Sequence, residues 1–249
     1  MKKEGKYPIY DNGELHVTIS KRNTKMGNIP SFSTLPGNMP LTLKNGVQLT
    51  NIKGTCGKHC AGCIKDCYAV RFCLFHHNSC IKAYGENTLI VRRDAIKLVN
   101  SIEEYCQKNI VKYFRFHTSG ELESLAQLEI YEKICERNPD VTFYIYTKAF
   151  DILDLWFRRL QAAKKKTPDN LVINLSEWHG NLEFIKESPY KEFYEKCNIF
   201  AYDDGESGDW VEGMTHCPAV NKDGTETGVT CAECRRCMKR GNVTAVYAH

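Results

Sequence analysis

The stretch IVKYFRFHTSGELESLAQLEIYEKICERNPDVTFYIYTK, residues 110–148, decides the fold of this chain. Residues 110–120 have the composition of a strand that ends in a polar turn. Residues 124–139 then place apolar side chains at helical spacing, with Pro139 as a stop. Residues 141–148 are a second strand-like run rich in aromatic and β-branched side chains. A strand, a helix and a strand in this order predict a βαβ unit with parallel strands.

The same alternation continues on both sides of this unit. Helices are predicted over 87–109 and 151–166, and further strands over 170–178 and 197–205. A short strand over 46–52 is also expected. The whole pattern predicts an α/β fold with a parallel sheet and crossover helices. The strands expected to be parallel neighbours lie near 111–117, 141–147, 171–177 and 198–203.

The N-terminal part of the chain lacks this regularity. Residues 20–40, SKRNTKMGNIPSFSTLPGNMP, are rich in Gly, Pro, Ser and Asn, which is typical of irregular structure. We therefore expect an irregular arm over 1–50, an α/β part over 51–205 and a cysteine-rich segment over 206–249. The basic residues of the arm are expected to lie over a ligand-binding cleft of the α/β part and to contact an anionic group. These residues are Lys21, Arg22 and Lys25.

Polar residues follow each predicted strand. Ligands of parallel α/β proteins bind at the carboxyl ends of the strands, so these residues are expected to surround one cavity. Its expected rim consists of His117, Glu121, Lys148, Glu177, His179 and Asp203.

Composition limits the functional classes. No apolar run approaches the roughly 20 residues that span a bilayer, and the N-terminus does not have the pattern of a signal peptide. We expect no membrane partner and a cytoplasmic location. The 13 cysteines are an odd number, and disulfides are rare in the cytosol, so clustered thiols favour metal binding or catalysis.

The C-terminal cysteines have the spacing of an iron–sulfur site. Cys231, Cys234 and Cys237 form C-x2-C-x2-C. Thirteen residues separate Cys231 from Cys217, which precedes Pro218. Such a run holds three thiolates against one cluster, and a distant cysteine supplies the fourth, as in bacterial ferredoxins. Zinc usually takes two separated C-x2-C pairs. The spacing therefore favours a [4Fe–4S] cluster that is bound by four thiolates.

A second group lies at TCGKHCAGCIKDCYAV, residues 55–70. Cys56, Cys60 and Cys63 are spaced C-x3-C-x2-C, which resembles the motif of radical S-adenosylmethionine enzymes. The resemblance implies a partial (β/α) barrel, with the cysteine loop 55–67 after the first strand. It also implies a [4Fe–4S] cluster with one open iron that S-adenosylmethionine chelates. Two features depart from that family: Gly62 replaces an aromatic residue, and Cys67 adds a thiol that would close the cluster if it bound the fourth iron.

The resemblance also assigns roles beyond the cysteines. The next strand in that family ends in a Gly-Gly-Glu-like turn that binds the amino group of the cofactor, and here Ser119, Gly120 and Glu121 match it. Ser176, at a later strand end, is a further candidate for cofactor binding. Glu121 and Lys148 are the candidate catalytic residues.

The chain as a whole resembles a family of phage and prophage proteins named after gene product eighty-eight of a mycobacteriophage. The matching pieces include ISKRNTKMGNIPSFSTLPG, CIKDCYA, RFHTSGELES, INLSEW and TCAECRRC, in this order, over residues 17–240. The resemblance implies phage origin, location in the bacterial host and iron–sulfur binding. Its C-x3-C-Tyr-Ala pattern selects Cys56, Cys63 and Cys67, whereas the radical-enzyme spacing selects Cys60 instead of Cys67. Both ligand sets stay open.

Three functions are consistent with these features. The first is a radical S-adenosylmethionine-like enzyme with an auxiliary cluster, served by an electron-donor protein and acting on a small molecule or nucleic acid. The second is a non-enzymatic iron–sulfur protein that transfers electrons or senses redox state. The third is a zinc protein that binds nucleic acid through its basic segments. Among the other cysteines, Cys73 and Cys80 are expected to be buried thiols, and Cys106, Cys135 and Cys197 are expected to be core residues.

Overall fold

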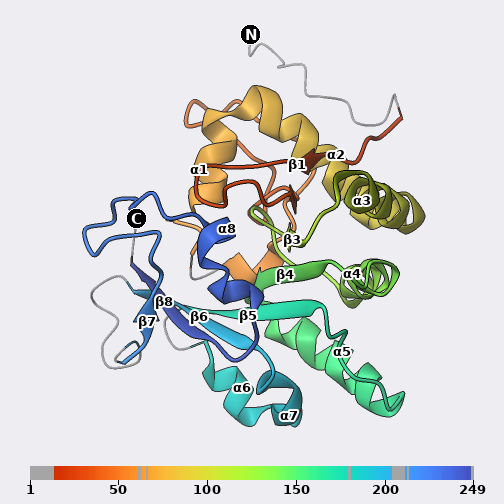
Figure 1. Cartoon of the computed structure of the whole chain (residues 1–249). Helices are drawn as coiled ribbons and strands as arrows, with labels where there is room; N and C mark the ends of the chain where they lie inside the picture. The colour runs from red at the N-terminus through yellow and green to blue at the C-terminus, as the bar shows by residue number, and fades with distance from the viewer. Residues whose placement is uncertain are drawn as a thin grey trace.

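The computed structural model describes residues 14–60, 63–65, 67–178, 181–203, 211 and 213–247, and of His77 and Asn78 only the backbone. One sheet runs through the centre, with helices along one side of it (Figure 1). None of the helices in these ranges combines the length and the apolar character that crossing a membrane would require.

The sheet has eight strands in the order β1-β2-β3-β4-β5-β6-β8-β7. Only the β1–β2 pair is antiparallel, and every other neighbouring pair is parallel. The α/β class and the four predicted parallel neighbours, which are β3 to β6, are thereby confirmed. The strands are β1 Ile19–Ser20, β2 Ser31–Phe32, β3 Tyr113–Phe116, β4 Thr142–Thr147, β5 Leu171–Glu177, β6 Asn198–Asp203, β7 Thr215–His216 and β8 Val243–Tyr247.

Helices connect the parallel strands in the predicted manner. Helix α4 joins β3 to β4, α5 joins β4 to β5, and the short helices α6 and α7 join β5 to β6. The α-helices are α1 Tyr68–Phe75, α2 His77–Arg93, α3 Ala95–Asn109, α4 Leu125–Arg137, α5 Phe150–Ala162, α6 Glu183–Glu187, α7 Lys191–Tyr194 and α8 Cys231–Cys234. Two 3-10 helices, η1 Gly57–Cys60 and η3 Arg236–Met238, lie in the two cysteine-rich segments.

Two local predictions are wrong. The single helix expected over 87–109 is interrupted at Asp94, whose extended backbone (φ −143°) separates α2 from α3. The Asp94 side chain accepts a hydrogen bond from the Lys97 amide, so it caps a new helix instead of continuing the old one. Residues 46–52 contain only an isolated bridge between Thr42 and Gln48 and no strand.

The main core lies between the sheet and helices α3, α4 and α5 (Figure 1). Alternate strand residues point into it, and Phe116 stacks on Tyr131 of α4 with ring centroids 4.0 Å apart. Cys106 and Cys135 are buried there, as predicted, and Cys197 packs against its edge. Cys73 and Cys80 are buried in a smaller cluster around α1 and α2, so both are the expected buried thiols.

The other face of the sheet is covered by the two ends of the chain. Met26 and Ile29 of the arm and Met238 of the C-terminal segment pack on Tyr144 and Val172. The arm is also less irregular than the sequence predicts, because β1 and β2 lie within it. The arm and the cysteine-rich segment therefore share one side of the sheet.

Candidate metal centres

The first cysteine group, which comprises Cys56, Cys60, Cys63 and Cys67, lies in the loop that follows β2. The Thr55 amide donates to Leu35 O (2.9 Å), and the Cys56 amide donates to Gly37 O (3.0 Å). In return, the Gly37 amide donates to Cys56 Sγ at 3.2 Å. Gly54 permits this close approach, since a Cβ there would lie 2.1 Å from Pro36 O. The loop is thus fixed to the carboxyl end of the first parallel strand.

The thiols of Cys56 and Cys60 lie within electrostatic reach of each other and of Cys67, and Cys60 is also within reach of Cys63. Burial raises the pKa of Cys56 well above its ordinary value, and the charges of Glu121, Cys67 and Cys60 raise it further. Burial likewise raises the pKa of Cys60, and Cys63 and Cys67 add to this effect. Both of the competing residues, Cys60 and Cys67, therefore lie at the site.

Lys148 supplies a cation to the first group. Its Nζ donates to Cys63 Sγ at 2.8 Å and lies 5.1 Å from the ring centroid of Trp178. Burial alone would lower the pKa of Lys148, but the neighbouring Cys63 thiolate outweighs it and the pKa is raised. Lys148 thus remains charged beside Cys63.

Glu121 connects the ends of β3 and β4. Its Oε1 accepts hydrogen bonds from the Leu122 amide (2.8 Å) and Thr147 Oγ1 (2.7 Å), and its Oε2 accepts one from the Lys148 amide (2.9 Å). The carboxylate is only 6% exposed. An amino group that bound here would have to share these oxygens with Thr147 and Lys148.

The turn before Glu121 is packed against β2 and the cysteine loop. Ser119 Oγ donates to Thr34 O at 3.0 Å. Gly120 has φ +85°, and a Cβ at this position would lie 2.0 Å from Thr34 Oγ1 and 2.7 Å from Thr55 Oγ1. A glycine is required both by the backbone angle and by the lack of space. The Ser-Gly-Glu turn is thereby brought against the first cysteine group.

His117 lies in the core and not on the rim of a cavity. It is 3% exposed, and its Nε2 is 2.9 Å from the hydroxyl of Tyr131. Burial lowers its pKa to about 4, so the imidazole is neutral at pH 7. His117 therefore organises the end of β3 from behind and is not exposed to a ligand.

Three further candidate residues lie on the next strands: Ser176 and Glu177 on β5, and Asp203 on β6. Glu177 is buried, and burial raises its pKa. Asp203 Oδ2 lies 2.9 Å from His216 Nε2. Ser176 is half-buried on β5, and its carbonyl accepts a hydrogen bond from Asn181. His179 lies outside the described residues.

The second cysteine group, which comprises Cys217, Cys231, Cys234 and Cys237, is assembled from separate segments. Cys217 follows β7, where its amide donates to Ala245 O of β8 (2.7 Å). Cys231 and Cys234 are the ends of α8, which Thr230 begins with a reciprocal capping box to Glu233. Cys237 belongs to η3. Burial raises the pKa of Cys237 to about 11, and the charges of the other three thiols contribute to this shift.

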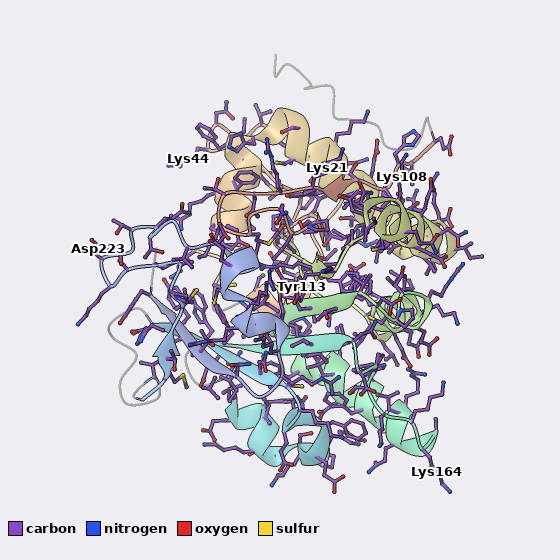
Figure 2. The ribbon with its side chains drawn as sticks, viewed as in Figure 1. Lys21, Lys44, Lys108, Tyr113, Lys164 and Asp223 are labelled. Carbon is purple, nitrogen blue, oxygen red and sulfur yellow. The ribbon has the colours of Figure 1, made fainter. Side chains whose placement is uncertain are left out.

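Side chains and backbone from distant parts of the chain hold the second group in place. The Cys231 amide donates to Lys25 O of the arm at 2.9 Å, and Asn174 of β5 donates to Cys237 O at 3.1 Å. Arg235, next to Cys234, lies over the ring of Tyr113, which Figure 2 shows beside α8. The segment thus folds on the sheet surface and not as an independent unit.

Two cations accompany the second group. Burial lowers the pKa of Lys25, and the thiolates of Cys217 and Cys231 oppose this shift. Burial raises the pKa of Cys231, and the charge of Arg115 opposes that shift. Lys25 thus lies beside the cysteines, whereas Lys21 and Arg22 are exposed.

Sequence reasoning missed Arg115 and Tyr146. The alternation of side chains in a strand could have indicated the position of Arg115. Phe114 and Phe116 point into the main core, so Arg115 between them must point to the opposite face. The C-terminal segment, which carries the second cysteine group, covers that face.

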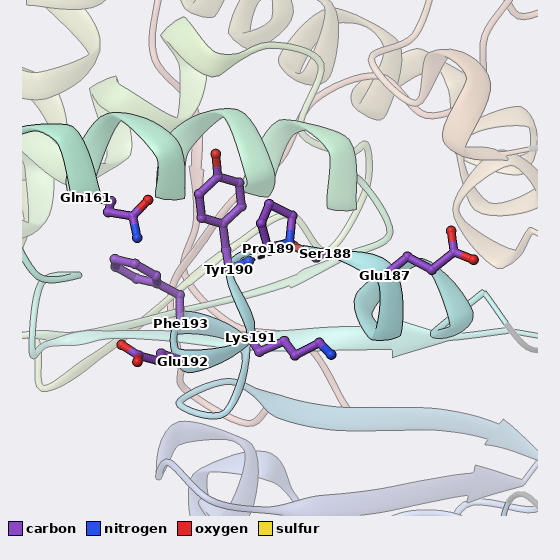
Figure 3. A pocket seen from close by; sticks show the side chains of 8 residues that line it. All are labelled: Gln161, Glu187, Ser188, Pro189, Tyr190, Lys191, Glu192 and Phe193. Carbon is purple, nitrogen blue, oxygen red and sulfur yellow. Dashed lines mark hydrogen bonds between the residues drawn. The ribbon is translucent and has the colours of Figure 1, made fainter.

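Within the described ranges, no three Cys, His, Asp or Glu side chains come close enough to hold a single metal ion. A pocket of about 440 Å³ lies elsewhere, between Gln161 at the end of α5 and residues 187–193 (Figure 3). It includes no cysteine.

Comparison with known proteins yields one match. The family described as Gene product 88 matches residues 17–240 of the chain. No curated protein and no solved structure matches the chain.

Proposed function

The chain belongs to the Gene product 88 family, and we propose that it is an iron–sulfur protein with two [4Fe–4S] clusters. Cys56, Cys60, Cys63 and Cys67 would supply the ligands of one cluster. Cys217, Cys231, Cys234 and Cys237 would hold the other. The proposal is carried by one observation: four thiols converge from separate segments in the second group, and half-buried cations lie beside them.

The donor chemistry fits this kind of cluster. Thiolates are the usual ligands of iron–sulfur clusters, and four of them give the site a net negative charge. Lys25 and Arg115 at the second group, and Lys148 at the first, offset that charge.

The order of the strands supports an enzymatic role for the first group. The parallel strands β2, β3, β4, β5, β6 and β8 follow one another in space as they do in sequence, as in a partial (β/α) barrel. The cysteine loop follows the first of these strands, and the Ser119–Glu121 turn follows the second. On this basis we propose a radical S-adenosylmethionine-like enzyme with an auxiliary cluster.

S-adenosylmethionine bound to an open iron would supply one-electron chemistry at this site. The chain's own residues would hold the site in place. Lys148 Nζ donates to Cys63 Sγ, Glu121 fixes the Lys148 backbone, and Trp178 covers the Lys148 cation. Ser119, Gly120 and Ser176 would lie along the cofactor.

A second candidate is a non-enzymatic electron-transfer or redox-sensing protein. It is favoured by the presence of both Cys60 and Cys67 at the first group, because four protein thiolates would leave no iron open. Either function requires electrons, and we propose that an acidic electron-donor protein supplies them.

The proposed donor would bind at α1, next to the first cysteine group. Tyr68, Phe72 and Phe75 share one face of this helix and are 54%, 47% and 81% exposed. Residues 53–82 carry five Lys or Arg and one Asp. The rest of the chain has 29 basic and 29 acidic residues. This local excess of four positive charges suits an acidic partner.

The docking proposal is tested by the rate at which a reduced flavodoxin, an acidic flavin protein, reduces the purified protein. Phe75→Ser should slow this reaction several-fold, and added salt should slow it for the unsubstituted protein. Ile110→Ser is the matched control, because Ile110 is equally exposed (84%) but lies at the end of α3. Equal rates for the two variants would contradict docking at α1.

The cluster proposal is tested by anaerobic reconstitution. We expect about eight iron and eight sulfide per chain. Zinc without sulfide would exclude the proposal. Electron paramagnetic resonance of the reduced protein should change when S-adenosylmethionine is added. An unchanged spectrum at saturating cofactor would leave the electron-transfer function and exclude the enzyme.

A further inference from the structure

Three basic segments of the chain meet at one edge of the sheet. They are residues 20–25, 164–166 and 235–240, and together they carry ten Lys or Arg and no Asp or Glu. The rest of the chain has 24 basic and 30 acidic residues. The positive charge is thus distributed unevenly along the sequence, and the fold decides whether these distant segments form one surface.

The C-terminal segment runs along the amino ends of the strands. Arg235 lies over the ring of Tyr113, which is the first residue of β3, at 5.5 Å from the ring centroid. Lys239 O accepts a hydrogen bond of 2.9 Å from Asn198, which is the first residue of β6. This edge is opposite the first cysteine group, which lies at the carboxyl ends of the strands.

Residues 164–166 reach the same edge through the loop that leads into β5. Arg240 Nη2 donates hydrogen bonds to Pro168 O at 2.7 Å and to Leu171 O at 3.2 Å. Leu171 is the first residue of β5. The loop that begins with residues 164–166 is therefore fixed to the C-terminal segment at the amino end of this strand.

The arm brings its cations to this edge as well. Strand β1 is antiparallel to β2, and its last residue, Ser20, pairs with Ser31, the first residue of β2. Lys21 and Arg22 follow Ser20 in the chain, so they continue beyond the amino end of β2. Cations thus accompany the amino ends of β2, β3, β5 and β6.

Seven of these cations are exposed, and we call them the basic edge: Lys21, Arg22, Arg235, Lys239 and residues 164–166. None of them forms an ion pair with an acidic residue in the part of the chain that the structure describes. Asp140, Asp169 and Glu195 precede β4, β5 and β6 and reduce the local excess of positive charge without cancelling it.

Two members of the basic edge have left-handed backbone. Lys164 (φ +54°) follows the C-cap of α5, and Arg235 (φ +55°) is the C-cap of α8. Glycine fits such positions without strain. The dipole of α5 favours a cation at this end, but the gain is smaller than the cost of left-handed backbone for a residue with a Cβ. Local strain of this kind is typical of functional sites, which indicates that both side chains have a use.

The three segments offer no apolar anchor to a protein partner. None of the large apolar side chains that are exposed in the described ranges lies within them. The core of a protein–protein interface is apolar and rich in aromatic residues, whereas interfaces with nucleic acid are more polar and much more positively charged. The composition of the basic edge therefore suits phosphate groups better than a protein surface.

We propose that the basic edge binds the phosphate backbone of nucleic acid without reading its base sequence. Lys and Arg side chains donate hydrogen bonds to phosphate oxygens, and the counterions that they release drive the association. This inference goes beyond the proposed function, because it holds whichever metal the second cysteine group binds. It also places the nucleic acid at the edge of the sheet that is opposite Glu121 and Lys148.

The test is the affinity of the purified protein for fluorescently labelled duplexes of about 20 base pairs, measured by fluorescence anisotropy over a range of salt concentrations. Duplex DNA and duplex RNA both present the phosphate backbone, so binding of either supports the inference and the tighter one identifies the source. Two DNA duplexes of unrelated sequence should bind alike, since phosphate contacts carry no sequence information.

Lys165→Gln combined with Lys166→Gln should weaken binding several-fold and should reduce the slope of log affinity against log salt by about two. The matched control is Lys44→Gln with Lys222→Gln, which removes the same charge from exposed positions. Figure 2 shows Lys44 and Asp223, the neighbour of Lys222, on the left and Lys164 at the lower right. The control should bind like the unsubstituted protein. If the first variant does not fold, Lys21→Gln with Arg22→Gln tests the other end of the basic edge.

Lys164→Gly separates the function of this side chain from its structural effect. It relieves the left-handed backbone, so it should raise the melting temperature and yet weaken duplex binding. Ile110→Gly is the matched control, because Ile110 is the C-cap of α3 with φ +51° and carries no charge. It should raise the melting temperature and leave duplex binding unchanged.

Three results would overturn the inference. The first is a protein that binds neither duplex. The second is an equal loss of affinity in the two double variants, because net charge alone would then explain the binding. The third is poly-L-glutamate that binds as tightly as the duplexes, which would assign the basic edge to acidic proteins. Iron and sulfide contents of the same samples test the proposed function separately, so the two failures are distinguishable.

Discussion

The two cysteine groups differ in how the chain brings their thiols together. The first lies within residues 56–67, and its loop is held by hydrogen bonds to residues 35–37 after β2. The second depends on β8, on Lys25 of the arm and on Asn174 of β5. A local loop next to strand ends can present an adjustable set of ligands. A group built from distant segments ties the ends of the chain to the sheet, so its ligands should be indispensable to the fold.

The largest expected effect is the loss of the second cluster. Cys237→Ser should lower the iron content from about eight to about four per chain. It should also lower the melting temperature by at least about 5 °C, because metal binding here contributes directly to folding. Iron analysis and thermal unfolding under anaerobic conditions measure both. Cys197→Ser is the control, since Cys197 packs at the edge of the main core away from both groups.

The same measurement on the first group sharpens the comparison. Of Cys60→Ser and Cys67→Ser, at least one should keep about eight iron per chain, because a cluster with an open iron needs only three thiolates. If each substitution removed the first cluster, both groups would be closed sites and the comparison would fail.

A smaller effect is expected from the turn that supports the first group. Gly120→Ala should cost about 1–2 kcal/mol for the left-handed backbone and a further 1–3 kcal/mol or so for the contact with Thr34. Gly228→Ala is the control, because Gly228 has nearly the same φ (+86°) but no atom within 4 Å of the added Cβ. Chemical denaturation of both variants isolates the packing cost. Equal losses of stability would mean that the turn can move away from the cysteine loop.

The neutral His117 behind this turn predicts a pH dependence. Its pKa is about 4 in the folded protein and 6.5 ordinarily, so the unfolded chain binds more protons between these values. The stability that this residue contributes is complete above pH 6.5 and is lost as the pH falls towards 4, by at most about 3 kcal/mol. The free energy of unfolding of His117→Gln should depend less steeply on pH over this window than that of the unsubstituted protein. Parallel pH profiles would contradict the burial of a neutral imidazole.

The smallest effect is expected from the cation at the first group. Lys148→Met removes the ammonium 2.8 Å from Cys63 Sγ. The potential of the first cluster should become more negative while that of the second stays unchanged, because the second has its own cations in Lys25 and Arg115. Lys108→Met, on the exposed surface of α3, is the control. A shift of both potentials would show that the two groups do not have separate electrostatic environments.

Much of the fold was predictable because it depends on local pattern. The apolar runs at 141–148 and 170–178 identified β4 and β5, and their alternation with helices predicted the parallel sheet. The prediction of one continuous helix was wrong where a single side chain caps a new helix. Asp94 lies in a stretch that is periodic on both sides, yet its capping hydrogen bond to Lys97 ends one helix and begins another.

The candidate sites were also predictable only in part. The cysteine spacing identified both groups, and the Ser119–Glu121 turn was correctly expected at the end of β3. The surroundings of the site could not be read from the sequence. Whether a polar residue at a strand end faces a cavity or the core depends on what packs behind it, and for His117 this is Tyr131, fourteen residues later.

The sequence by itself determined the α/β class and the two sets of thiols, because strand and helix periodicity and ligand spacing are properties of short segments. Only the tertiary structure decided that the arm and the C-terminal segment cover the same face of the sheet, and that Arg115 lies over Tyr146 on this face. These facts depend on contacts between residues far apart in the chain, such as Lys25 with Cys231 and Arg115 with Tyr146. No local pattern encodes such contacts, since they are selected by the packing free energy of the whole fold.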